Sequence, residues 1–186
     1  MTHEEMKKKV FALIEELNPD NPNLTDDPDI SAKYNYVANQ VMFELARMKK
    51  LSKYVEMPVA KGQLVTFEDI GMAVGYEVYQ VERIAGVLYE PKANNTVFKI
   101  REDGTAEIDC FVFPEQITEK TKGNYQFELP ADVLEIMPYG IAADLLKSDI
   151  SSDYGSIYAT RYETMLQRLD PRNFMPSISV EGGVRI

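Results

Sequence analysis

The stretch YEVYQVERIAGVLYE, residues 76–90, decides the fold class of this chain of 186 residues. Side chains along it alternate with the period of two that is typical of a β-strand, and Gly86 interrupts the alternation as a bulge or bend. Similar short runs lie on both sides, and Asp103-Gly104 between two of them indicates a type I′ hairpin. Seven or so strands at this spacing predict an antiparallel β-sandwich or small barrel over residues 52–130.

Two further runs belong to this β region. Residues 64–67 form an extended run after a Lys-Gly turn, and residues 125–129 form the last run before Pro130. Both are rich in apolar and aromatic residues and are bounded by turn residues, so we expect both to be strands.

Outward from the β region the apolar positions recur every three to four residues, which is the helical period. Thr2 and Glu5 form a capping box at the start of a first helix. Asp29 or Ser31 is expected to cap a second, longer helix that ends near Lys50. The chain therefore enters the β region from a pair of helices.

The helical period returns at Ala131, where apolar residues lie nearly all round the helix and indicate a central, buried segment. Pro138 with Gly140 is expected to break this segment into two pieces. A last helix is expected to begin at Ser151 or Ser152, and it carries one broad apolar stripe.

The order of the elements predicts an α+β fold with one insertion. The helices of the two chain ends bury their apolar stripes only by meeting, so residues 1–51 and 131–170 are expected to form one helical module. Residues 52–130 are then an inserted β domain. Residues 171–186 contain two prolines and a Gly-Gly pair and are expected to form a C-terminal arm.

Composition and charge argue against several function classes. Apolar residues make up 45% of the chain, which is enough for a folded core. The net charge of −10 gives ordinary nucleic-acid binding no basic patch to use. An acidic surface suits a wall past which DNA slides, although plain solubility explains it more simply. The sequence shows neither a signal-peptide pattern nor a membrane-spanning run, so we expect a cytoplasmically made protein without a membrane partner.

The chain has one cysteine, Cys110, and one histidine, His3, so few side chains are available as catalytic nucleophiles, bases or metal ligands. Neither a disulfide, a metal cluster nor a thiol–base pair is readily built from them, and phosphate-loop and dinucleotide motifs are missing. His3 is expected to be exposed in a first helical turn, and the acidic loop of residues 25–29 lacks the ligand spacing of a calcium site. We therefore expect a protein that is not an enzyme, with no catalytic residue, no metal site and no cofactor.

Two sets of residues are candidates for contacts with a partner. Tyr154, Tyr158 and Tyr162 recur at helical spacing and form either an aromatic ladder for a partner or, more simply, a face packed in the bundle. The arm carries apolar residues without room for a core, and its Ser-Ile-Ser-Val run could add to a sheet edge. A tail folded back on its own domain is the alternative. The arm residues expected to contact a partner are Phe174, Met175, Ile178, Val180 and Ile186.

Two segments resemble small neck proteins of tailed phages and prophages. The first is ISAKYNYV, residues 30–37, continued by LAR at 45–47. The second is MPYGIAADLL, residues 137–146, continued by YETMLQRLDP at 162–171. These segments, which are mostly helical in pattern, are similar to head–tail connector, or neck adaptor, proteins.

The resemblance implies a subunit that joins other copies of itself in a ring-like oligomer between the portal and the tail. Its partners would be portal, tail or neck proteins, and it would pass from the cytoplasm of the bacterial host to the virion neck. A β-sandwich binding module that recognises a peptide or carbohydrate is the alternative, and it predicts a monomer with an aromatic-lined pocket. We therefore expect a non-enzymatic virion assembly protein.

Overall fold

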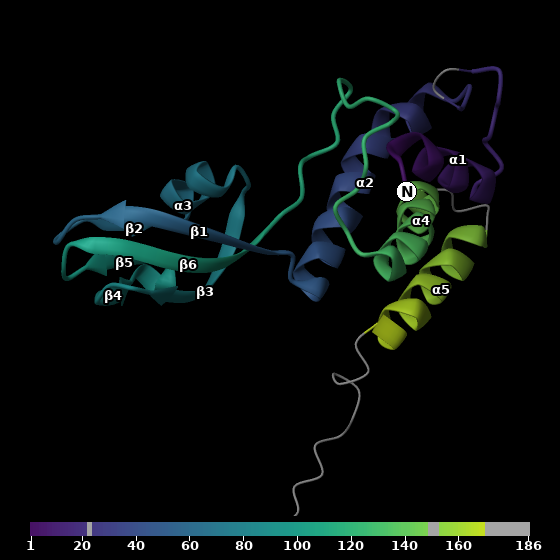
Figure 1. Ribbon diagram of the computed structural model, residues 1–186. Helices are drawn as coiled ribbons and strands as arrows, with labels where there is room; N and C mark the ends of the chain where they lie inside the picture. Colours follow the sequence, from purple (N-terminus) through teal and green to yellow (C-terminus); the bar gives the residue numbers. More distant parts are fainter. Residues whose placement is uncertain (22–23, 149–152, 170–186) are drawn as a thin grey trace, which may run out of the picture.

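A computed structural model describes residues 1–21, 24–148 and 153–169. The fold is α+β, as the sequence predicts, and consists of a helical lobe and a β lobe at opposite ends of Figure 1. In chain order the elements are α1 (His3–Leu13), α2 (Pro28–Lys49), β1 (Ser52–Val59), β2 (Leu64–Thr66), α3 (Phe67–Val74), β3 (Val78–Ala85), β4 (Tyr89–Lys92), the 3₁₀-helix η1 (Ala93–Asn95), β5 (Val97–Ile100), β6 (Gly104–Val112), α4 (Ala131–Leu145), the 3₁₀-helix η2 (Leu146–Ser148) and α5 (Tyr154–Leu169).

The two ends of the described chain meet in the helical lobe. Figure 1 shows α1, α2, α4 and α5 together, while the six strands and α3 form the β lobe. Tyr34 and Val41 of α2, Leu145 of α4 and Tyr162 of α5 lie in one hydrophobic core. The β lobe has a second core, to which both of its sheets and α3 contribute.

The first residues of α1 and α2 test the N-caps that the sequence predicts. The capping box is confirmed: Glu5 N donates to Thr2 Oγ1 at 3.1 Å, and Thr2 N donates to Glu5 Oε2 at 2.8 Å. The expected cap of α2 is wrong, because Asp27 caps it with bonds from the amides of Asp29 and Ile30. Proline favours the first helical position, so the helix starts before the residues that we expected as caps.

The expected break in α4 is also wrong, because α4 is one helix that contains Pro138. An internal proline costs about 3 kcal/mol. Burial of Met137 and Ile141, which lie on either side of it and are fully buried, contributes about 1.5–3 kcal/mol each. Packing against α1, α2 and α5 therefore outweighs the local preference.

The strands form two antiparallel three-stranded sheets, in the orders β1-β6-β3 and β2-β5-β4. The hairpin expected at Asp103-Gly104 is wrong, because β5 and β6 belong to different sheets. Neither residue has the positive φ of a type I′ turn. Instead, Asp103 Oδ1 accepts a hydrogen bond from Lys61 N at 2.8 Å, at the point where the chain crosses between sheets. Gly86 does make the expected bend, with φ of 79° between β3 and β4.

Residues 64–67 are only partly a strand, because Phe67 begins the helix α3. Thr66 and Asp69 make a reciprocal capping box, and Gly75 ends the helix with a φ of 77°. The sequence contains this Thr-x-x-Asp pattern, so the capping-box rule that predicted α1 could also have predicted α3.

The segment between β6 and α4 is not the strand that we expected at residues 125–129. Figure 1 shows this segment running beside α2 before α4 begins. Its buried side chains Phe113, Ile117, Phe127 and Leu129 join the core of the helical lobe. Among the described residues, this segment pairs like a strand only at one isolated antiparallel bridge, between Gln126 and Thr2.

Asn39 of α2 fixes this segment with two hydrogen bonds to one residue. Asn39 Nδ2 donates to Ile117 O at 2.8 Å, and Ile117 N donates to Asn39 Oδ1 at 2.7 Å. We expect Asn39→Ala to lower the free energy of unfolding by about 1–3 kcal/mol, because both groups of Ile117 lose their partner. Urea denaturation measures this, with Asn124→Ala at an exposed position as the control. Equal stability of the two variants would contradict the assignment.

Candidate functional site

Aromatic side chains fix the β lobe to the helical lobe. The ring of Phe113 lies 4.8 Å from that of Phe43 on α2 and 4.7 Å from that of Tyr79 on β3, measured between centroids. Tyr79 Oη donates to Ala46 O at 3.3 Å, and the Arg47 guanidinium lies 4.9 Å from the centre of the Phe113 ring. The two lobes are therefore joined by packed rings as well as by the chain crossings, which favours a fixed relative orientation.

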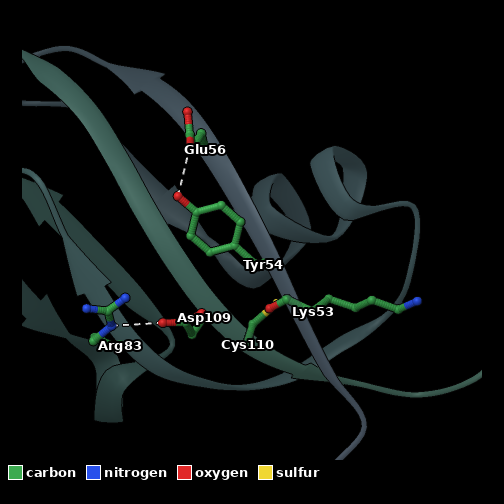
Figure 2. Close-up of polar contacts among 6 residues, drawn as sticks. All are labelled: Lys53, Tyr54, Glu56, Arg83, Asp109 and Cys110. Atoms are coloured by element: carbon green, nitrogen blue, oxygen red, sulfur yellow. Dashed lines mark hydrogen bonds and ion pairs between the residues drawn. The ribbon is translucent and has the colours of Figure 1, made fainter.

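The outer face of the sheet β1-β6-β3 carries three carboxylates, Glu56, Glu107 and Asp109, which we call the acidic face. Glu56 lies directly opposite Glu107 in the strand register. Arg83 on β3 neutralises one carboxylate, with Nε 2.8 Å from Asp109 Oδ2 (Figure 2). Like charges opposite each other destabilise a sheet, so the Glu56–Glu107 pair is a feature that folding does not favour.

Tyr54 lies beside the acidic face and is 51% exposed. Its hydroxyl donates to Glu56 Oε1 at 2.9 Å, as Figure 2 shows. This hydrogen bond and the neighbouring carboxylates raise the pKa of Tyr54 to about 12. The phenol therefore stays neutral at physiological pH and serves as a hydrogen-bond donor.

Cys110 lies on β6, next to Asp109 in sequence, and belongs to the core of the β lobe. Its Sγ is 3.6 Å from Lys53 O (Figure 2), which is the distance of a weak S–H···O contact. Burial raises the pKa of the thiol. The thiol is therefore protonated and shielded, which is the environment of a structural cysteine rather than a nucleophile.

The last helix exposes apolar and cationic side chains. Tyr154 and Ile157 are 54% and 55% exposed. A hollow of about 530 Å³ follows the helix, and its lining includes Ile157, Arg161, Met165 and Arg168, which we call the α5 surface. The Arg161 guanidinium stacks over the ring of Tyr139 at 4.4 Å, so it is held in place by α4.

The other tyrosines of α5 serve packing. Tyr162 is buried, and its hydroxyl donates to Glu44 Oε2 at 3.1 Å. Burial raises its pKa. The hydroxyl of Tyr158 donates to Leu13 O of α1 at 2.6 Å. The simpler interpretation of the tyrosine pattern thus fits two of the three residues, while Tyr154 is left half exposed.

The arm residues singled out in the sequence, Phe174, Met175, Ile178, Val180 and Ile186, lie outside the described residues, as do Ser151 and Ser152. In the acidic loop, Asp27 caps α2 and Asp26 accepts bonds from the side-chain amides of Asn18 and Asn21. Within residues 1–21, 24–148 and 153–169, no group of three His, Cys, Asp or Glu side chains is placed to hold a metal ion.

The expectation that His3 is exposed is wrong, because its side chain is only 3% exposed. Its ring lies 5.9 Å from that of Tyr34 and 6.3 Å from that of Phe127. Burial, together with the nearby charge of Lys7, lowers the pKa of His3 to about 4. The position in a first helical turn did not reveal this, since the covering segment comes from residues more than 110 positions away.

Comparison of the sequence with models of known protein families and with curated proteins gave no match. None of the helices in the described part of the chain is both long and apolar enough to cross a membrane.

Proposed function

We propose that this protein is a non-enzymatic assembly subunit that forms a ring-like oligomer and acts as a head–tail connector in the neck of a tailed phage or prophage. The observation that carries the proposal is the α5 surface, where an exposed isoleucine and two arginines lie along one hollow. Exposed apolar side chains beside charged ones are typical of protein–protein contacts.

The occupant that we propose for the α5 surface is a second copy of the chain. The protein has a net charge of −10, so its own surface offers many carboxylates to Arg161 and Arg168. A cation that approaches the acidic face would reduce the repulsion between Glu56 and Glu107. These two surfaces lie on different lobes, and a contact between two different surfaces repeats from copy to copy, which generates a ring when the rotation between copies closes.

The resemblance to neck adaptors supports the virion role. The segments that carry it pack together: Tyr34, Leu45, Met137, Leu145 and Tyr162 all lie in the core of the helical lobe. The similarity therefore concerns one structural unit. On this proposal the helical lobe docks, and the partners are portal, tail or other neck proteins.

We expect Ile157→Glu to weaken self-association at least about thirtyfold, because the new carboxylate would pair with Arg161 four residues on and would repel the carboxylates of the acidic face. Light scattering after size exclusion measures the mass in solution. Leu64→Glu is the matched control, because Leu64 is equally apolar, is 56% exposed and lies on the sheet β2-β5-β4, which carries neither the α5 surface nor the acidic face. If both variants assemble equally well, α5 takes no part in the contact between copies.

A β-lobe binding module remains the second candidate. A hollow of about 530 Å³ lies beside α3, and its lining includes Phe67, Met72 and Tyr76. Met72 is 72% exposed there, as in a surface that accepts an apolar peptide side chain. A monomer that binds peptides or sugars, with binding lost in Met72→Ser, would favour this function over assembly.

A further inference from the structure

The hollow beside α3 in the β lobe leaves apolar side chains open to solvent. Its volume is about 530 Å³, its apolar lining includes Phe67, Met72, Tyr76 and Val78, and we call it the α3 hollow. Both ends of α3 are capped, so the helix that forms one wall is fixed. Met72 is 72% exposed. A segment that covers Met72 would remove apolar surface from water, which contributes about 25 cal/mol per Å².

The rim of the α3 hollow is acidic. Glu68 and Glu77 belong to the lining and are exposed, and neither makes an ion pair among the residues that the structure describes. Lys53 Nζ lies 4.2 Å from the centre of the Tyr76 ring, and the Tyr76 hydroxyl donates to Glu128 Oε1 at 2.6 Å. One cation thus faces three carboxylates, so the hollow favours an apolar segment that carries a positive charge.

The arm, residues 171–186, has the composition that this hollow favours. It contains two arginines and one glutamate, so its net charge is positive in a chain with a net charge of −10. Arg172 stands two positions before Phe174, and Met175 follows directly. This short run offers a cation for the rim, together with an aromatic ring and a thioether for the lining. Contacts between methionine sulfur and aromatic rings are favourable, and Met72 is available for such a contact.

The position of α5 favours the arm of a neighbouring copy. The arm follows α5 in the chain, and α5 lies in the helical lobe, whereas α3 lies in the β lobe at the opposite end of Figure 1. The five residues from Leu169 to Phe174 span at most about 18 Å even when fully extended. This short reach suits a hollow on the next copy better than the hollow on the same copy.

We propose that the α3 hollow of one copy binds the arm of the next copy. In this contact Phe174 and Met175 cover Met72, and Arg172 faces the two carboxylates of the rim. The inference rests on the proposed function, because it gives the assembling copies a contact in addition to the α5 surface. The occupant is a segment of the chain itself rather than a foreign peptide.

Binding of a fluorescein-labelled peptide with the sequence of residues 171–186 tests this contact by fluorescence anisotropy. The protein is the full chain with Phe174→Asp and Met175→Asp, so that its own arm does not compete. We expect saturable binding with a dissociation constant of roughly 10–100 µM. A peptide with Arg172→Gln should bind severalfold more weakly, because it loses the charge that faces the rim. Equal binding of a peptide with the reversed sequence would overturn the proposal and favour a general peptide-binding module.

Variants of the same protein locate the site. Met72→Ser should weaken peptide binding about tenfold or more, since the apolar contact is lost at an exposed position where folding is not at risk. Leu88→Ser is the matched control, because Leu88 is 65% exposed on the same lobe and lies outside the α3 hollow. Equal binding by these two variants, or no saturable binding at all, would overturn the proposal.

Two comparisons separate this contact from ring formation and from binding within one copy. Ile157→Glu should leave peptide binding unchanged, so loss of rings and loss of arm binding are observed separately. At concentrations where the chain with an intact arm is monomeric, it should bind the peptide as tightly as the arm variant does. Tighter binding to the arm variant would show that each arm fills the hollow of its own copy, which would contradict the assignment to the next copy.

Discussion

Replacing Gly140 by valine is expected to destabilise the protein by about 3 kcal/mol or more, because the site has no room for a side chain. A Cβ atom at Gly140 would lie 2.8 Å from Tyr162 Cε2 and 3.0 Å from Val41 Cγ1. The glycine therefore sets how closely α4 approaches α2 and α5. Alanine should cost about 1–2 kcal/mol, since its helix propensity, worth about 1 kcal/mol, offsets part of the overpacking.

Gly155 provides the matched control on α5. A Cβ atom there would lie 3.4 Å from Leu146, which is an ordinary contact, so Gly155→Ala should be neutral or stabilising by up to about 1 kcal/mol. Thermal or urea unfolding compares the two alanine variants. Partial rescue of Gly140→Ala by Val41→Ala would identify the contact, while equal stability of the two single variants would contradict the packing argument.

Acidification is expected to destabilise the protein through His3, with a loss of about 2–3 kcal/mol between pH 7 and pH 4.5. The pKa of His3 is lowered from 6.5 to about 4 in the folded protein. The unfolded chain therefore binds the proton more readily in this window. The stabilising contribution is complete above pH 6.5 and is lost as the pH falls toward 4.

His3→Phe isolates this contribution. The phenyl ring would lie among the rings of Tyr34 and Phe127 and cannot take up a proton. The carboxylates titrate alike in both proteins, so the difference in unfolding free energy between them should change with pH only where His3 titrates. Parallel pH profiles for the two proteins would show that His3 is not buried in its neutral form.

Local rules located the elements whose signals lie within a few residues. The Thr2–Glu5 capping box is where the sequence placed it, and the same rule would have located α3 at Thr66 and Asp69. The two errors at Pro138 and at Asp103-Gly104 have a common cause. Each is a place where contacts distant in sequence outweigh a local preference: three packed helices around Pro138, and a change of sheet at Asp103.

The candidate sites were less accessible to sequence reasoning. Exposure of Ile157 could not be read from the apolar stripe of α5, because a broad stripe does not show which of its edges is covered. The burial of His3 depends on a segment that was expected in the β domain, so it could not be expected from the sequence. The acidic face was not predicted, because alternation along β6 places only Glu107 and Asp109 on one side, and the opposing Glu56 becomes apparent only from the strand register.

The central claim, that the α5 surface of one copy binds the next copy in a closed ring, is tested most directly by electron microscopy of the purified full chain. The account predicts ring-shaped class averages with one rotational symmetry, and their loss in Ile157→Glu but not in Leu64→Glu. Monomers or twofold dimers at the same protein concentration would contradict it.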